Sequence, residues 1–371
     1  MKKILLIDTT WPINSRTERF KNSFKKYFKV IVVAWNRGSV GVKEELEGTY
    51  ILDTNIGYGN QLKKLLKLPL FFIHIYSVCK KEKPNVFFAS HWDSLICAVL
   101  LKLIWNWKVK IIYDCLDLPT LSNNIIRKII IYIEKICLKF VNLTIFASRH
   151  FKPLYSKKVK SYIFENYPST ELLNSTSTEP DWIKRYDDKI PKGSKNVAWI
   201  GVVRYLDIIE NILLAIKDTN ICFFVFGDGP DLDKLVKAVN FYKLEKQVFF
   251  FGRYKPSDLK YIYEKSDLVW AAYPTNDFNA VYAISNKYFE CSFFEKRIVL
   301  SKKTKMAEDL QDNSSVIIVD EYSPNDIKEK LKSNTTVFFN KYSKYENDMT
   351  WEDQEDKLID SIKKYCNFLI K

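Results

Sequence analysis

The sequence lacks the features that define several classes of protein. Its three histidines are too few and too dispersed for a metal cluster, and its seven cysteines include no C-x-x-C pair. Most of the cysteines lie in apolar runs, which predicts buried free thiols in a reducing compartment and neither disulfides nor a zinc site. The sequence contains no run of 18 apolar residues, so we expect no membrane-spanning helix. Short-period repeats and low-complexity tracts are also absent.

The first residues are expected to form a strand and not a secretion signal. The segment MKKILLIDTTWP has two lysines and a short apolar run, but Asp8 and turn residues follow, and no small-residue cleavage site is present. The cytoplasm is therefore the expected location.

Positive charge is in excess. The net charge of +14 over 371 residues favours acidic partners, such as nucleotide diphosphates, anionic lipid headgroups or nucleic acid. Residues 121–160 contain nine Lys and Arg against one acid, and residues 61–83 contain six lysines against one acid. Basic residues beside an apolar helical face favour attachment to an anionic membrane, although a buried helix with a solvated lysine edge would give the same pattern. No nucleic-acid-binding motif is present, so nucleic acid is not an expected partner.

Strand-like and helix-like segments alternate along the whole chain. Strands such as KVIVVAW read as continuous apolar runs, which indicates parallel sheets covered on both faces, and thus doubly wound α/β domains. The polar segment 173–195 separates a first domain, 1–172, from a second, 196–351. Residues 352–371 form a terminal helix, and Pro69 is expected to break or kink the long helix around it. We expect ligands in a cleft where the carboxyl ends of the two sheets face each other.

One stretch of the second domain, residues 267–301, is the most informative. Ser285 is a suitable N-cap, which places free backbone N–H groups and Lys287 at the start of a helix and favours an anion there. Glu290, one turn later, could reach a sugar hydroxyl, although an ordinary capped helix would give the same pattern. This stretch is predicted to contain a strand, Leu268–Tyr273, and then a polar loop, Pro274–Ile284. A helix from about Asn286 and a second strand, Arg297–Leu300, are predicted to follow.

Polar residues follow three further strands of the same domain. The first strand is followed by Gly201 and Arg204, the second by the turn Gly227-Asp228-Gly229, and the third by Arg253 and Tyr254. Glycine lets a ligand approach the backbone, and arginine can bind a diphosphate through two N–H groups. Because the carboxyl ends of parallel strands meet at one edge, these loops together predict a nucleotide site.

The series G-x-x-R, FGDGP, FGRY, SNKYFE and RIVLS resembles the donor-binding domain of retaining GT-B glycosyltransferases, and more narrowly glycosyltransferase family 4, the group 1 transferases, of the bacterial surface-polysaccharide type. In the first half, ASHWDSL, YDCLDLP and ENYPS are similar to segments of that family. Trp351 and Glu352 resemble the start of its crossing helix.

The resemblance implies a fold of two facing doubly wound domains with a C-terminal helix that crosses back to the first. It implies an acceptor-binding first domain, a donor-binding second domain, and sugar transfer from a nucleotide-diphosphate sugar with retention of configuration. The acceptor would be a glycan or a polyprenyl-linked glycan in capsule or O-antigen biosynthesis. No metal or other cofactor is implied, and the protein would lie at the inner face of the membrane.

The resemblance also implies roles for individual residues. Glu290 would hold the ribose hydroxyls, while Arg204 and Lys287 would hold the diphosphate. His91 would be the active-site histidine. The remaining donor-binding residues would be Gly201, Gly227, Gly229, Arg253, Tyr254, Asp277, Asn279, Tyr282, Ser285 and Asn286, with Arg253 and Tyr254 near the base.

The sequence also departs from the family pattern. Tyr282 stands where many members have a second glutamate that contacts the donor sugar, so Asp277, Asn279 or Tyr282 would have to replace it. Residues 8–12 stand in place of a glycine pair. His91 matches the histidine only with a one-residue slip, since a gapless match gives Ser90. An epimerase or inverting transferase on the same fold, or a non-catalytic nucleotide-binding homologue in an assembly complex, therefore remains as an alternative.

Overall fold

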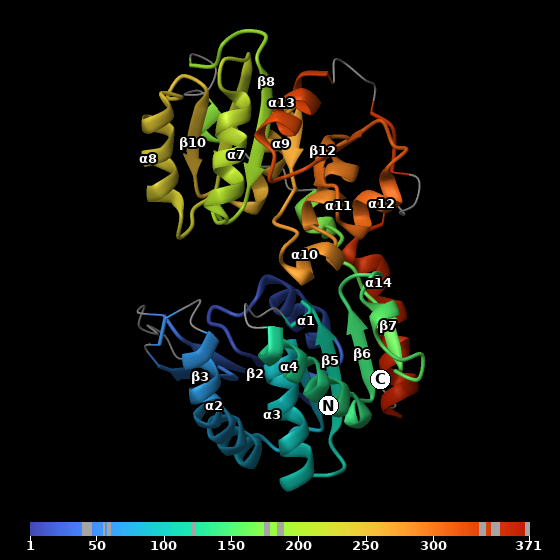
Figure 1. The fold of residues 1–371 in the computed structure, drawn as a ribbon. Helices are drawn as coiled ribbons and strands as arrows, with labels where there is room; N and C mark the ends of the chain where they lie inside the picture. The colour runs from blue at the N-terminus through green and yellow to red at the C-terminus, as the bar shows by residue number, and fades with distance from the viewer. Residues whose placement is uncertain are drawn as a thin grey trace. The chain divides into compact units, whose positions relative to one another are not determined.

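The computed structural model describes residues 1–38, 47–54, 56–57, 61–119, 124–173, 179–183, 189–333, 339–342 and 349–367. The chain divides into two compact units. Unit 1 contains Met1–Glu165 and Asp353–Lys371, and unit 2 contains Asn166–Glu352 (Figure 1). The boundary falls before the segment 173–195 that the sequence suggests as a linker, of which residues 174–178 and 184–188 lie outside the described residues.

Unit 1 contains a seven-stranded parallel sheet in the order β3-β2-β1-β4-β5-β6-β7. In the centre, Leu5 of β1 lies opposite Ile31 of β2 and Phe87 of β4. The inner strands β1, β4, β5 and β6 are buried on both faces, as expected for a doubly wound sheet, whereas the edge strands β3 and β7 are only partly buried. Their bounds are β1 Lys3–Asp8, β2 Lys29–Asn36, β3 Thr49–Asp53, β4 Val86–Ser90, β5 Lys110–Cys115, β6 Leu143–Phe146 and β7 Ser161–Ile163.

The helices of unit 1 cover both faces of this sheet. The connection through α1 runs toward β3, whereas those through α2, α3 and α4 run toward β7. Because such crossovers are right-handed, α1 lies on one face and α2, α3 and α4 lie on the other. The α-helical bounds are α1 Ser15–Lys25, α2 Gln61–Glu82, α3 His91–Ile104, α4 Asn124–Cys137 and α14 Trp351–Cys366, and the short 3-10 turns are η1 Leu138–Phe140 and η2 Lys152–Leu154.

Two predictions about these helices can be compared with the structure. Of the expected break or kink at Pro69, the break is wrong, because α2 continues through this residue as one helix. The terminal helix does return to unit 1. Glu355 of α14 pairs with Lys26 of α1 at 2.9 Å, and Gln354 accepts a hydrogen bond from the backbone N–H of Glu165 at 2.9 Å.

Unit 2 contains a six-stranded parallel sheet in the order β10-β9-β8-β11-β12-β13. The strands are β8 Lys195–Ile200, β9 Ile221–Phe226, β10 Val248–Gly252, β11 Leu268–Trp270, β12 Arg297–Ser301 and β13 Val316–Val319. The helices are α5 Thr170–Leu173, α7 Leu206–Ile216, α8 Leu232–Tyr242, η3 Pro256–Asp258, α9 Leu259–Glu264, α10 Phe278–Tyr282, α11 Asn286–Phe293, α12 Lys305–Leu310 and α13 Pro324–Ser333.

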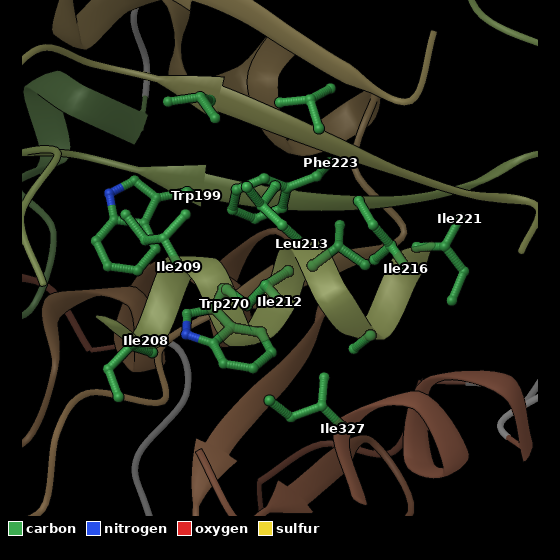
Figure 2. Close-up of a cluster of buried hydrophobic side chains, with 14 of the residues drawn as sticks. Trp199, Ile208, Ile209, Ile212, Leu213, Ile216, Ile221, Phe223, Trp270 and Ile327 are labelled. Atoms are coloured by element: carbon green, nitrogen blue, oxygen red, sulfur yellow. The ribbon is translucent and has the colours of Figure 1, made fainter. Parts of the chain in front are cut away.

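The core on one face of this sheet is built around α7. This helix places Ile209, Ile212 and Ile216 at helical spacing against the sheet, and all three are fully buried. Figure 2 shows them beside Trp199 of β8 and Trp270 of β11, with Ile327 of α13 nearby. A second cluster includes Tyr288 and Phe289 of α11, so the helix that bears Lys287 and Glu290 is fixed by packing.

The predicted fold class, doubly wound α/β in two parts, is confirmed. The helix α11 begins at Asn286 as predicted, with the Ser285 hydroxyl accepting a hydrogen bond from the N–H of Lys287 at 3.2 Å. The loop Pro274–Ile284 is not irregular throughout, because α10 forms inside it. The cause is an N-cap, since Asp277 accepts a hydrogen bond from the N–H of Asn279 at 2.9 Å.

The prediction of buried free thiols is also confirmed, because all seven cysteines are free and buried. Among the described helices, none has the length and apolar character needed to cross a membrane.

Candidate functional site

Unit 2 has a topological switch point beside β8. From β8 the chain passes through α7 to β9 on one side, while β11 pairs with β8 on the other. Ligands of open α/β sheets bind at the carboxyl ends of the strands at such a point. The loops that follow β8, β9, β10 and β11 therefore form the candidate site.

Gly227 and Gly229 are required by the packing of one loop on another. A Cβ atom at Gly227 would lie 1.8 Å from the carbonyl oxygen of Gly201, and one at Gly229 would lie 2.2 Å from that of Val203. The N–H of Val203 donates to the carbonyl of Asp228 at 3.0 Å, and the N–H of Gly227 donates to that of Gly252 at 2.7 Å. The three loops are thus joined by their backbones. At Gly201, with φ 132°, a Cβ would meet nothing within 4 Å, so this glycine borders open space.

Arg253 forms an ion pair that the sequence did not predict. Its Nε lies 2.9 Å from Oδ2 of Asp228, while the N–H of Gly229 donates to Oδ1 of the same carboxylate at 2.7 Å. The Arg253 guanidinium and the Gly229 N–H lower the pKa of the Asp228 carboxyl. The side chain of Arg253 is 85% exposed, so a ligand can reach its outer face.

Arg204 lies at the end of the β8 loop and is exposed. Its guanidinium carbon lies 4.8 Å from the centre of the Tyr205 ring, a cation–π distance. Tyr205 has φ 67°, which is uncommon for a residue other than glycine and sets the direction in which the chain enters α7.

Lys287 and Glu290 form a nearly buried ion pair at the start of α11. The Lys287 Nζ lies 2.6 Å from Oε2 of Glu290, and the Tyr263 hydroxyl donates to the same oxygen at 2.6 Å. Burial opposes the charge of Lys287, but the adjacent Glu290 carboxylate outweighs it and raises the pKa of Lys287. The predicted neighbours Lys287 and Glu290 are therefore brought together, and they neutralise each other.

Two tyrosines connect this pair to the other loops. Tyr254 is half-buried, and its pKa is raised by burial and by the proximity of Glu290, while Lys287 acts in the opposite direction. Tyr273 lies between the β8 loop and α11, with its ring 5.9 Å from that of Trp199 and 6.2 Å from that of Tyr205. Arg204, Tyr205, Tyr254 and the Lys287–Glu290 pair thus belong to one continuous edge.

The loop after β11 is held by a residue that follows β13. Glu321 is buried and accepts hydrogen bonds from the N–H of Thr275 at 2.9 Å and from its hydroxyl at 2.5 Å. Asp277 and Asn279 form the cap of α10, and Tyr282, at its end, packs against Phe278 with ring centres 5.0 Å apart. Asp277 is therefore engaged by the backbone of α10.

His91 belongs to unit 1 and stands at the carboxyl end of β4, with φ 69°. His91 is close enough to Asp93 and Asp114 to act on the pKa of both carboxyls in the lowering direction, although burial leaves the pKa of Asp114 raised. Ser90, the alternative match, is buried and lies 2.9 Å from the Thr17 hydroxyl, whereas His91 is partly exposed.

The surroundings of His91 are a network of buried ion pairs. Asp114 accepts from Nε of Arg16 at 2.9 Å, and both side chains are almost fully buried. Asp93 pairs with Lys64 and accepts from the Thr9 hydroxyl at 3.2 Å. Burial would raise the pKa of Asp93, but Lys64 and His91 outweigh that effect and lower it.

Four residues of the unit 2 edge were not among the site residues predicted from the sequence: Asp228, Tyr263, Tyr273 and Glu321. Asp228 had a local signal, since it lies between Gly227 and Gly229. The other three are Tyr263 in α9, Tyr273 in the loop after β11 and Glu321 just after β13. They reach the edge through tertiary contacts, for which no spacing rule exists. Over the described part of the chain, no three His, Cys, Asp or Glu side chains come together as metal ligands.

The whole chain shares its fold with GT-B proteins. It aligns with Anabaena Alr3699/HepE, solved in complex with UDP and glucose, at a TM-score of 0.71 and 13% identity over 98% of this chain and 99% of that one. Sucrose-phosphate synthase from Thermosynechococcus elongatus aligns at 0.70 and 12% identity, over 98% and 99%. UDP-N-acetylglucosamine 2-epimerase from Rickettsia bellii aligns at 0.63 and 14% identity, over 99% and 97%. The fold is therefore GT-B.

Sequence comparison adds a narrower match. Residues 181–336 match the family model of glycosyl transferases group 1, and this segment, less than half of the chain, contains the four loops of the unit 2 edge. No curated protein matches the chain by sequence.

Proposed function

We propose that the protein is a glycosyltransferase that moves a sugar from a nucleotide-diphosphate sugar to a glycan or polyprenyl-linked glycan acceptor, with retention of configuration. The observation that supports this most is that the matched segment 181–336 brings Arg204, Arg253 and the start of α11 to the switch point of one sheet. Two guanidinium groups and a helix start at one edge suit a diphosphate.

In this proposal the residues of unit 2 divide the donor between them. Arg204 binds the diphosphate from the β8 loop, where Gly201 leaves open space. Lys287 supplies positive charge at the N-terminus of α11, and the free lone pairs of Glu290 accept the ribose hydroxyls. Arg253 and Tyr254 lie on the side of the nucleobase. The donor sugar is contacted by Asp277, Asn279 or Tyr282.

The proposed reaction requires no metal and no protein nucleophile. The bond between the anomeric carbon and the diphosphate oxygen breaks, a bond to the acceptor oxygen forms on the same face, and the acceptor proton passes to the departing diphosphate. The contribution of the protein is to stabilise the negative charge that develops on the leaving group. His91, in unit 1, is proposed as the histidine of the acceptor side.

The proposed setting is surface-polysaccharide biosynthesis on the cytoplasmic side of a membrane. Buried free thiols fit a reducing compartment, and a polyprenyl-linked acceptor would be presented at a membrane surface.

A nucleotide-sugar epimerase is the second candidate, since the epimerase from Rickettsia bellii has the same fold. The two activities differ in their requirements. An epimerase converts free UDP-sugar with no acceptor present, whereas the proposed transferase releases nucleoside diphosphate at a useful rate only with an acceptor.

A thermal-shift screen against UDP, GDP, ADP, CMP and their common sugar conjugates tests the donor site. A nucleotide present at about a hundred times its Kd should add roughly 2.7 kcal/mol of stability. Stabilisation by one nucleoside diphosphate and its sugar conjugates is the expected result. If no nucleotide raises the melting temperature, Arg204, Lys287 and Glu290 do not form a donor site. That result would favour a protein that is not a glycosyltransferase.

A further inference from the structure

Helix α4 exposes a row of apolar side chains and buries an acidic one. A surface helix normally turns its apolar stripe to the core and its charges to solvent. In α4 the residues Ile129, Tyr132 and Ile136, spaced by three and four, are all exposed, Tyr132 by 67%. On the opposite side of the same helix Glu134 is buried, where it accepts hydrogen bonds from the hydroxyls of Tyr113 at 2.5 Å and Tyr155 at 3.0 Å.

The neighbouring helix α3 shows a second stripe of this kind. Leu100, Leu103 and Ile104 near its end are exposed, and Trp107, one turn further, is 62% exposed. The ring of Trp107 touches that of Phe140 just after α4, at 6.3 Å between centres. The stripes of α3 and α4 are therefore adjacent.

Helix α2 provides a third stripe. Leu66, Leu70 and Ile73 lie at i, i+4 and i+7, with Leu66 exposed by 72%. The buried Phe71 and Ile75 lie on the other side of the helix. Since α3 packs against both α2 and α4 on one face of the sheet, the three stripes share the outer surface of one helical layer (Figure 1). We name this surface the α2–α4 face.

On these three helices the acidic side chains are paired or turned inward, whereas several lysines are exposed. Their three acids are all turned inward or paired: Asp93 with Lys64, Glu134 with two tyrosines, and Glu82 with Lys3 at 3.0 Å. Two lysines are also turned inward, since Lys64 pairs with Asp93 and Lys102 of α3 is buried, whereas other lysines lie outside. Among them, Lys67 and Lys80 on α2 and Lys128 and Lys135 on α4 are exposed.

From this arrangement we propose that the α2–α4 face docks on an anionic membrane surface. The exposed leucine, isoleucine, tyrosine and tryptophan side chains would enter the headgroup region, and the lysines would meet the lipid phosphates. Polar–apolar residues such as Tyr132 and Trp107 suit that boundary. This inference rests on the proposed function in one respect: a lipid-linked acceptor would be the reason for the enzyme to bind a membrane.

A second copy of the chain fits this face less well. A two-fold contact would place the same lysines against each other, and no outward carboxylate of α2, α3 or α4 could pair with them. An anionic lipid surface provides the missing charge.

Co-sedimentation of the full chain with vesicles tests the proposal. Vesicles of phosphatidylcholine alone are compared with vesicles of phosphatidylcholine and phosphatidylglycerol. We expect binding to the anionic vesicles, much weaker binding to the neutral ones, and weakening as salt is raised. Ile129→Glu should reduce the fraction bound to anionic vesicles about tenfold.

Phe241→Glu is the matched control, because Phe241 is 79% exposed on α8 of unit 2 and far from this face in sequence. It should bind vesicles like the unmodified chain. Lys128→Gln with Lys135→Gln, both exposed and thus safe for folding, should also weaken binding to anionic vesicles.

Three results would overturn the proposal: no binding to either vesicle, equal binding to both, or unchanged binding by Ile129→Glu. Concentration-dependent dimers that Ile129→Glu abolishes would assign the face to a second copy instead. Vesicle binding needs no nucleotide, so its failure leaves the donor site intact, and failure of the nucleotide screen leaves the vesicle result intact.

Discussion

The two sheets have the same kind of switch point, but the side chains at the carboxyl ends of their strands differ. In unit 1 the carboxyl ends of β1, β4 and β5 are occupied by buried side chains that pair with one another, such as Arg16 with Asp114 and Lys64 with Asp93. In unit 2 the corresponding edge consists of closely packed glycine loops, and its guanidinium groups, Arg204 and Arg253, point to solvent. The ion pairs at the unit 1 edge are buried, whereas the unit 2 edge also has exposed guanidinium groups, although Arg253 pairs with Asp228 and Lys287 pairs with Glu290.

In the proposed function, this difference is the reason why the unit 2 edge, and not the unit 1 edge, would hold the diphosphate. A phosphate needs cations whose donors are accessible, and in unit 1 the guanidinium of Arg16 already serves a carboxylate and the carbonyl of Phe164 at 2.7 Å. Buried pairs of this kind fix the shape of an edge, and breaking one leaves an isolated charge in the interior.

The largest effect is expected from Lys64→Met in unit 1. It removes the partner of a fully buried carboxylate and should lower the free energy of unfolding at pH 7 by about 3–5 kcal/mol. Lys21→Met, which removes a partly exposed pair with Glu18, should cost less than about 1 kcal/mol. Urea unfolding of both variants measures the difference, and equal small losses would contradict the description of the unit 1 edge.

The same pair predicts a pH dependence. The pKa of Asp93 is lowered in the folded state, so its contribution to stability is present above its unfolded pKa, about 3.9, and is lost as the pH falls through the folded value. The difference in the free energy of unfolding between the wild type and Lys64→Met should therefore become smaller below about pH 4. A difference that stays constant in urea titrations from pH 7 to pH 3 would mean that Asp93 is not the group that Lys64 stabilises.

A somewhat smaller effect is expected from Gly227→Ala in unit 2. Its Cβ would overlap the carbonyl oxygen of Gly201, and the positive φ adds strain, so a loss of about 3 kcal/mol or more in stability is expected. Gly201→Ala is the matched control, with a similar φ and open space, and should cost roughly 1–3 kcal/mol from strain alone. If both variants lose the same stability, the loops are not packed as described.

Lys287→Met should lower turnover, and it should also lower stability, because it leaves the nearly buried Glu290 carboxylate without its ammonium partner. If Lys287 stabilises the leaving diphosphate, kcat should fall about a hundredfold, or roughly 2.7 kcal/mol, with a smaller change in the KM for the donor. Steady-state assays with the donor found in the nucleotide screen give both constants. A rise in KM with unchanged kcat would make Lys287 a ground-state clamp. Lys305→Met, which breaks an exposed pair with Glu308, should leave both constants unchanged.

The smallest effect is expected from Arg204→Ala. The side chain is exposed, so stability should change by less than about 0.5 kcal/mol, while nucleoside diphosphate affinity should fall roughly tenfold, or about 1.4 kcal/mol. Lys234→Ala on α8, equally exposed, should not change the affinity. Titration calorimetry of the two variants compares them directly, and equal affinities would exclude Arg204 from the phosphate site.

The sequence was informative where the signals are local. Strand periodicity gave the parallel sheets, and the Ser285 cap placed the start of α11 at Asn286. Features that depend on tertiary contacts could not be predicted from the sequence. Pro69 is accommodated within α2, Gly227 and Gly229 are required by close contact with the backbone of Gly201 and Val203, and Tyr263 reaches Glu290 from another helix. Glu290 also pairs with Lys287, so Glu290→Ala would leave a buried ammonium unpaired and cannot be assumed to leave stability unchanged.

The most direct test of the central claim is hydrogen exchange of the full chain with and without saturating UDP, the nucleotide present in the HepE structures, or whichever diphosphate the screen selects. The account predicts slowed exchange in the loops 201–204, 227–229 and 252–254 and at the start of α11, with little change among the paired residues at the unit 1 edge. Protection confined to the carboxyl ends of β1, β4 and β5 of unit 1 would contradict it.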